Sequence, residues 1–446
     1  MMNRRATVAA VLAVTAVTVS ACSVTDSETA TAIETFTPEA VTWGNCESAF
    51  AATYPAVPAV DRLECASVSV PADYRDLGGP SIELAISRLP AASEHSRGTL
   101  IVNPGGPGIE GRSMPALIGD TAGMSEWDII GVDVRGTGAS PRPSCTALDT
   151  LAPPDRAPEQ ASEKVLADRA RAYIDVIAAA NRACADIDGP MLSTFTVATA
   201  AADLEQVRSA LGGPRISYFG VSWGTALGLA YRTLFPEHLD TMVLDSTVYL
   251  GASAAEQDRD LAAALAVERD AEPVGGDPSE QVDSDDGDAA PDTEPSALPV
   301  PTDPLNQLTL STRTAYICNA LDALPPADVQ WSDHVSATRA VGLSIDGRLP
   351  TPANSELPGA SLCSGWPTPG SPFAVSDTGT PLLLVGHRDE TVTPYRWTTV
   401  AAERAGATVM TADDGNHGSA LFGPCSAAIV AFLDSARTPA ATCPTQ

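Results

Sequence analysis

Short apolar runs alternate with longer amphipathic segments through most of this 446-residue chain. The apolar runs are rich in Val, Ile and Leu and are bounded by Gly, Pro or Asp, which is typical of buried β-strands. The segments between them show helical periodicity. We expect strands at 82–89, 99–102, 127–132, 216–221, 241–244, 381–385 and 407–410, and helices at 162–183, 196–211 and 223–235. This alternation predicts an α/β fold with a mostly parallel sheet, in which the first strand is an edge hairpin partner.

The alternation stops after residue 250 and resumes near residue 376. Between these points the pattern is mainly helical and is interrupted by an acidic tract, Asp270 to Asp303, which holds eleven acidic residues and no Lys or Arg. Such a tract has too little apolar surface to collapse, and we expect it to be disordered. The pattern therefore predicts a core of residues 41–250 and 376–446, with a helical cap at 251–375 that contains the insertion 270–303.

The most informative segment is Gly220-Val221-Ser222-Trp223-Gly224, which follows one expected strand and opens one expected helix. A Gly-x-Ser-x-Gly turn in this position raises the serine Oγ above the edge of the sheet, where it acts as a nucleophile. Glycine on both sides allows the strand and the helix to approach closely. The pentapeptide also occurs by chance in glycine-rich turns with a surface serine. Its context favours Ser222 as a catalytic nucleophile.

A second glycine-rich segment, Asn103 to Gly108, follows the expected strand at 99–102. In folds with this nucleophile turn, one oxyanion N–H comes from a loop after an early strand and the other from the residue after the nucleophile. We predict the N–H groups of Gly106 and Trp223 as donors, with Gly105 as the alternative to Gly106. The competing interpretation of the segment is an ordinary loop.

The chain contains only five histidines, which narrows the search for a general base. His95, His238 and His334 lie in polar or helix-end surroundings and are expected at the surface, and His387 lies beside the candidate acid. His417 occupies a glycine-flanked loop between the last strand and a terminal helix. This position matches the chain order serine, acid, histidine, so His417 is the predicted base.

The acid that orients the base is expected in the segment 386–394, after the penultimate strand. Two adjacent carboxylates compete for the role. Gly-x-x-Asp spacing favours Asp389, whereas counting back from Thr393-Pro394 favours Glu390. We predict Asp389, because its shorter side chain holds an imidazole with less rotamer freedom. The other carboxylate is then a solvated loop acid.

The N-terminus has the pattern of a targeting segment. Arg4 and Arg5 precede an apolar stretch that is too short for a comfortable membrane span and that ends in Val19-Ser20-Ala21-Cys22. This resembles a lipobox, so we expect residues 1–21 to be a lipoprotein signal peptide, Cys22 to be lipidated and residues 22–40 to form a flexible tether. The alternative is an ordinary secretory signal with an incidental Cys22.

The cysteines and the charge restrict the class of protein further. Of nine cysteines, eight remain without Cys22, an even number that predicts four disulfides in an exported chain. Sequence neighbours form natural pairs: Cys46–Cys65, Cys145–Cys184, Cys318–Cys363 and Cys425–Cys443. No Cys-x-x-Cys or histidine at ligand spacing indicates a metal site. A formal net charge of −30 argues against nucleic acid as a partner.

Several motifs in combination resemble the secreted tripeptidyl and prolyl aminopeptidase branch of the α/β-hydrolases. They are Val41–Cys46, Cys65–Tyr74, Asn103–Gly108, Asp133–Ser140, Gly220–Gly224 and Val392–Tyr395. The resemblance implies an α/β-hydrolase fold with an inserted helical cap, and hydrolysis at free peptide N-termini by Ser222, Asp389 and His417. The chain departs from the family in the ambiguity at the acid and in the long acidic insertion. The glycines of Asp133–Ser140 also resemble a phosphate-binding loop, but the spacing is wrong and no helix follows, so we expect a structural role.

The sequence thus predicts a serine exopeptidase that is lipid-anchored outside the cytoplasm, with a peptide bearing a free N-terminus as substrate. Contact with the membrane is expected through the lipid anchor only, and no metal or organic cofactor is implied. A carboxylester hydrolase of the same fold is the nearest alternative, because one triad cleaves both bond types. A non-catalytic ligand-binding lipoprotein is the alternative from another class.

Overall fold

The computed structural model describes residues 36–54, 57–93, 95–151, 162–271, 310–321, 326–340, 359–367, 370 and 372–443. The expected signal peptide, Cys22, most of the tether and residues 272–303 of the acidic tract lie outside the described residues.

A nine-stranded sheet with the strand order β1-β2-β3-β5-β4-β6-β7-β8-β9 forms the core. Its strands are β1 (Gly44–Asn45), β2 (Glu64–Pro71), β3 (Ser81–Leu89), β4 (Thr99–Asn103), β5 (Asp128–Val132), β6 (Ile216–Val221), β7 (Leu239–Asp245), β8 (Leu382–His387) and β9 (Thr408–Ala412). Strands β1, β2, β3 and β5 pair antiparallel. The pairs from β5 through β4, β6, β7 and β8 to β9 are parallel. This confirms the expected mostly parallel sheet.

The expected edge strand at 82–89 is internal. β3 pairs with β2 on one side and with β5 on the other. The sequence prediction missed β2, although its serines and valines alternate between exposed and buried positions as in a half-solvated antiparallel strand.

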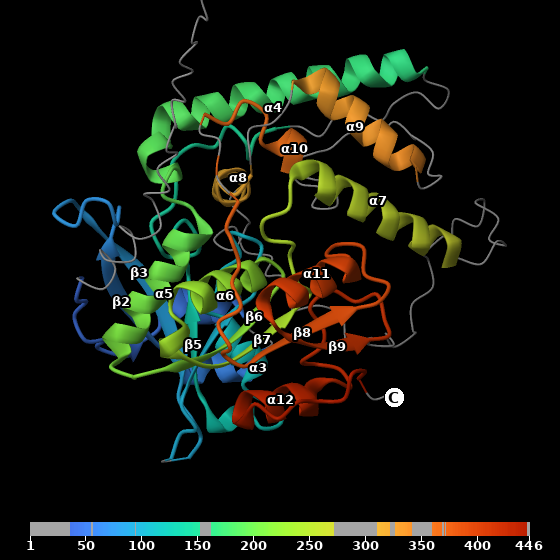
Figure 1. The fold of residues 1–446 in the computed structure, drawn as a ribbon. Coiled ribbons are helices and arrows are strands. Elements are labelled where there is room, and N and C mark those ends of the chain that lie inside the picture. The colour runs from blue at the N-terminus through green and yellow to red at the C-terminus, as the bar shows by residue number, and fades with distance from the viewer. Residues whose placement is uncertain are drawn as a thin grey trace, which may run out of the picture.

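Helices cover both faces of the parallel part of the sheet, which is why every residue of β6 and β8 is buried. One face carries α5 (Val197–Leu211), α6 (Trp223–Leu234) and α11 (Tyr395–Ala405), and the other carries α3 (Met114–Ile118) and α12 (Ser426–Ser435) (Figure 1). Each layer packs its own apolar cluster against the sheet. Shorter elements complete the core: α2 (Ser48–Thr53), η1 (Pro58–Arg62), η2 (Met124–Glu126) and η3 (Pro236–His238).

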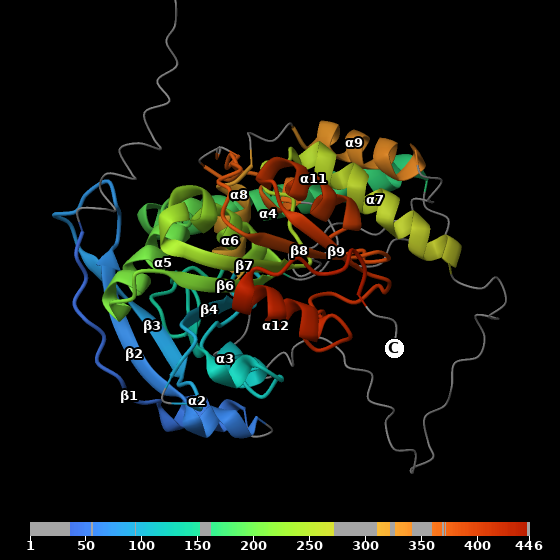
Figure 2. The ribbon, with the colours of Figure 1, turned by 60° about the horizontal axis from the view of Figure 1, so that its bottom comes forward.

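A group of helices lies above the end of the sheet where the parallel strands terminate (Figures 1 and 2). It contains α7 (Ala254–Ala271), α8 (Leu310–Cys318), α9 (Ala327–Ala340) and α10 (Gly359–Leu362), all from the region expected to form the cap. The long helix α4 (Glu163–Leu192), which the sequence placed in the core, packs with them. Its Tyr173 and Ile177 form an apolar cluster with Trp331 of α9, and Asn181 donates hydrogen bonds of 2.8 Å to the carbonyls of Leu362 and Ser364. The cap is therefore assembled from two separate stretches of chain.

All four expected disulfides are formed: Cys46–Cys65, Cys145–Cys184, Cys318–Cys363 and Cys425–Cys443. Cys318–Cys363 joins α8 to the segment after α10, so it links two parts of the cap covalently. Within the described ranges, none of the helices combines the length and the apolar character needed to cross a bilayer.

Candidate active site

Ser222 occupies the turn between β6 and α6, with φ 56° and ψ −126°. A positive φ is strained for a serine and is typical of a functional position that the surrounding structure enforces. The flanking glycines explain how the turn closes. A Cβ on Gly220 would lie 2.5 Å from the carbonyl oxygen of Gly224, and a Cβ on Gly224 would lie 2.6 Å from that of Asn103. The nucleophile turn expected from the sequence is present.

The glycine-rich loop after β4 lies directly against this turn. Gly105 has φ 98°, and a Cβ there would lie 2.5 Å from the Val221 carbonyl oxygen and 3.0 Å from the Trp223 nitrogen. The N–H of Gly105 donates to Asn103 Oδ1 at 2.9 Å, so it is already used. Among the described residues, the N–H groups of Gly106 and Trp223 donate no hydrogen bond. This keeps Gly106 and Trp223, rather than Gly105, as the proposed oxyanion donors.

His417 lies in the loop after β9, and its Nδ1 contacts Glu390 Oε1. The loop also touches the turn that carries the serine, because a Cβ on Gly418 would collide with the side chain of Val221. With Nδ1 donating to a carboxylate, Nε2 is the nitrogen left to accept a proton, a tautomer that we assign from this contact. His417 is thus arranged as a general base.

The prediction of Asp389 as the partner of His417 is wrong. Asp389 is exposed, and its backbone N–H donates to the carbonyl of Asp414 at 3.0 Å. Glu390 is 2% exposed, and its Oε1 also accepts hydrogen bonds from Thr393 N at 3.1 Å and Thr393 Oγ1 at 2.5 Å. Glu390 points into the protein and Asp389 points toward solvent. This difference in direction, and not the length of the side chain, decides which carboxylate contacts the imidazole.

Ser246, directly after β7, is a site residue that the sequence did not reveal. It is fully buried and has φ 57°. Its hydroxyl donates to Glu390 Oε2 at 2.9 Å and accepts from the Gly418 N–H at 2.8 Å. One hydroxyl therefore joins the acid to the loop of the base. A non-glycine residue at positive φ is not visible in a sequence, so no local signal marked this serine.

A second histidine, three residues before Glu390, is fully buried. His387, at the end of β8, contacts Asp245 Oδ1 through Nε2 at 2.9 Å and Asp414 Oδ1 through Nδ1 at 2.5 Å. Burial alone would lower the pKa of His387, but these two carboxylates raise it to about 9. Asp245 Oδ2 also accepts from Ala420 N at 3.0 Å. A charged imidazole therefore ties the end of β7 to Asp414 on one side of the His417 loop, and Asp245 itself bonds to Ala420 on the other side.

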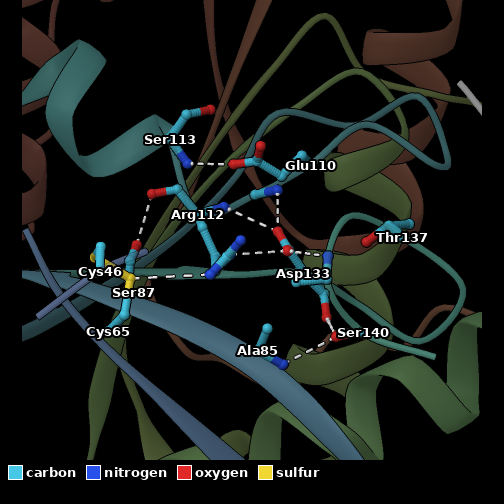
Figure 3. Close-up of polar contacts among 12 residues, drawn as sticks. Cys46, Cys65, Ala85, Ser87, Glu110, Arg112, Ser113, Asp133, Thr137 and Ser140 are labelled. Carbon is cyan, nitrogen blue, oxygen red and sulfur yellow. Dashed lines mark hydrogen bonds and ion pairs between the residues drawn. A yellow bond between two sulfur atoms is a disulfide. The ribbon is translucent and has the colours of Figure 1, made fainter. Parts of the chain in front are cut away.

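The segment after the glycine-rich loop is anchored by Asp133 (Figure 3). This fully buried carboxylate accepts from the N–H groups of Gly111, Arg112 and Ala139 at 2.9, 3.1 and 2.9 Å. It also pairs with the guanidinium of Arg112 at 3.0 Å. Arg135 in turn pairs with buried Asp203 through two bonds of 2.7 and 2.6 Å. The charged groups of the Asp133–Ser140 motif are thus satisfied within the protein, as its expected structural role requires.

The model of the α/β hydrolase fold family matches residues 98–424, which is most of the chain and includes the serine, the acid and the base. The chain belongs to this family.

Three curated relatives of this α/β hydrolase are named as enzymes. The chain is 35% identical over 197 residues to a tripeptidyl aminopeptidase of Streptomyces lividans, a match that covers 42% of this chain and 35% of the relative. It is 32% identical over 224 residues to the serine protease Hip1 of Mycobacterium tuberculosis, covering 48% and 41%.

A carboxylesterase B of Mycobacterium tuberculosis is 29% identical over 225 residues, again with 48% of this chain and 41% of the relative covered. The matches thus span well under half the length of these relatives. Family membership and site geometry agree on an α/β hydrolase, and the relatives carry both peptidase and esterase names.

Proposed function

We propose that this protein is a serine hydrolase of the peptidase type, which cleaves short peptides or single residues from free peptide N-termini. The observation that carries the proposal is the contact of His417 with buried Glu390, on a loop packed against the turn that holds Ser222 at positive φ. Arrangement of a serine, an imidazole and a carboxylate in this way is the machinery of acyl transfer.

In this proposal each group has one role. His417 Nε2 removes the proton from Ser222 as its Oγ attacks the scissile carbonyl, while Glu390 holds the imidazole in the required tautomer and stabilises its charged form. The N–H groups of Gly106 and Trp223 donate to the oxyanion. His417 then protonates the leaving amine, and water hydrolyses the acyl-enzyme by the same steps in reverse.

Two observations support peptidase over esterase chemistry. The relatives with the two higher identities are named as a peptidase and a protease. The aminopeptidase-like motifs are distributed along the whole core. The helical cap over the nucleophile turn, where Tyr316 of α8 packs on Trp223 with ring centroids 4.7 Å apart, is compatible with both chemistries. A carboxylester hydrolase remains the second candidate, because one relative bears that name. A purely ligand-binding role would not require the contact of His417 with buried Glu390 or a serine held at positive φ.

We also propose that the protein is exported and held at the membrane by a lipid on Cys22. Four disulfides, which persist in oxidising compartments, support export. Replacement of Cys22 by Ala should release the protein from the membrane fraction, whereas an unchanged membrane fraction would contradict the anchor.

The deciding experiment compares one tripeptidyl-arylamide with its N-acetylated form, beside simple acyl esters. A free ammonium contributes a charge-assisted contact, so acetylation should reduce kcat/KM by roughly tenfold to a hundredfold. Equal cleavage of both forms with fast turnover of esters would assign the protein to the esterases.

A further inference from the structure

Helix α8 is the part of the cap that touches the catalytic loops. Thr312 Oγ1 donates to the carbonyl of Gly136 at 2.8 Å, and Tyr316 Oη donates to that of Arg135 at 3.1 Å. Tyr316 also packs on Trp223, the residue after the nucleophile. These contacts fix one face of α8 against the ends of β5 and β6.

Arg313 projects from the same helix toward the glycine-rich loop. Its Nη1 donates to the carbonyl oxygen of Gly106 at 2.7 Å, which is the only polar contact of this side chain among the described residues. Gly106 supplies a proposed oxyanion N–H, so the guanidinium is bonded to the residue that is to hold the reacting carbonyl. Desolvation lowers the pKa of Arg313, although the residue keeps part of its surface exposed to water.

Arg313 differs from its neighbours near the glycine-rich loop in having no described counter-ion. Two buried arginines near the loops are each paired with a buried acid, Arg112 with Asp133 and Arg135 with Asp203. No described carboxylate pairs with Arg313, although the chain carries a formal net charge of −30. A guanidinium has five N–H donors, and a desolvated cation is costly unless an anion pairs with it.

We propose that Arg313 binds a carboxylate of the substrate beside the scissile bond, which makes it a specificity residue for acidic substrates. The proposal rests on the proposed hydrolase function. The carboxylate comes either from the side chain of the residue whose carbonyl is attacked or from the C-terminus of a short peptide. Both present the same planar anion, which matches the fork of a guanidinium.

Two pairs of substrates separate these sources. Ala-Ala-Glu-nitroanilide against Ala-Ala-Gln-nitroanilide tests the side chain, and tetra-alanine against its C-terminal amide tests the terminal carboxylate. The wild-type protein should prefer the charged member by about tenfold or more in at least one pair. The preference should shrink at high salt, because an exposed part of the interaction is screened. A wild-type preference below about twofold in both pairs would overturn the proposal, whatever the variants do.

Substitution then tests the residue itself. Arg313→Met should bring the ratio of kcat/KM values for the preferred pair to near one, and Arg313→Lys should keep part of it, since lysine retains the charge without the fork. Arg396→Gln is the matched control, because Arg396 also bridges core and cap through Asp260 but lies on the exposed side of α11. It should keep the wild-type ratio. A ratio unchanged in Arg313→Met would overturn the assignment.

Failure of the proposed function gives a different pattern. If no peptide is cleaved but nitrophenyl esters are, the peptidase proposal fails while Arg313 remains testable. The nitrophenyl ester of glutaric acid should then be preferred over that of its monoamide in the wild type and not in Arg313→Met. Equal turnover of the two esters by the wild type would overturn the proposal.

Discussion

Ser246 donates a hydrogen bond of 2.9 Å to Glu390 and accepts one of 2.8 Å from the N–H of Gly418, the residue after the proposed base. Its backbone is held at φ 57°, where a serine is strained. A single buried hydroxyl thus sets the distance between the acid and the loop of His417. The triad depends on a residue that is not part of it.

Loss of this hydroxyl should impair the chemical step. Ser246→Ala removes the hydrogen-bond partner of Glu390 Oε2 and of the Gly418 N–H, so kcat should fall about tenfold while KM changes little. Ser246→Gly also lacks the hydroxyl, but glycine relieves the positive φ. Both variants should lose kcat equally, and the glycine variant should melt at the higher temperature of the two. Wild-type kcat in Ser246→Gly would show that only backbone strain matters.

The two adjacent acids should differ sharply. Glu390→Gln removes the charge that faces His417 and should reduce kcat by orders of magnitude, as expected when the base loses its orienting carboxylate. Asp389→Asn changes an exposed side chain and should leave kcat within about twofold. The kcat values of the two variants, measured by steady-state kinetics on a substrate that the wild type cleaves, decide which carboxylate is the triad acid. The opposite result would return the acid role to Asp389.

The outcome at these acids shows what a sequence can and cannot specify. The nucleophile turn and the loop of the base were predictable, because glycine spacing and chain order are local features. The choice between Asp389 and Glu390 depends on Ser246, which tertiary packing brings from the end of β7 to Glu390. The local contact of Thr393 with Glu390 agrees with the alternative offered by counting back from Thr393-Pro394. The place of α4 in the cap was likewise hidden, since it is determined by contacts such as that of Asn181 with Leu362, far apart in sequence.

Gly105 should tolerate no side chain. A Cβ there would collide with the Val221 carbonyl and approach the Cβ of Ser222 to 2.9 Å, so Gly105→Ala should displace the nucleophile turn and reduce kcat/KM by about a hundredfold or more. Gly212→Ala is the matched control, since Gly212 also has positive φ, 73°, but a Cβ at this position would have no neighbouring atom within 4 Å. It should cost stability and leave activity intact. Comparable losses of activity in both variants would contradict close packing at the turn.

His387 should make stability depend on pH. Its pKa is raised from 6.5 to about 9 in the folded protein, so its contribution is complete below pH 6.5 and is lost as the pH rises through about 9. The contribution is at most about 3 kcal/mol to the free energy of unfolding. Urea unfolding of the wild type between pH 6.5 and 9.5 should show this decline, and His387→Gln should show a flatter profile. Parallel profiles would indicate that the imidazole is neutral.

The central claim is that Ser222 is the nucleophile of a serine hydrolase, and covalent labelling tests it most directly. A fluorophosphonate reacts only with a serine that an adjacent base activates. Mass spectrometry of the labelled protein should place the adduct on Ser222 alone, and Ser222→Ala should take up no label and turn over no substrate while unfolding like the wild type. An adduct on a different residue, or turnover by Ser222→Ala close to that of the wild type, would contradict the account.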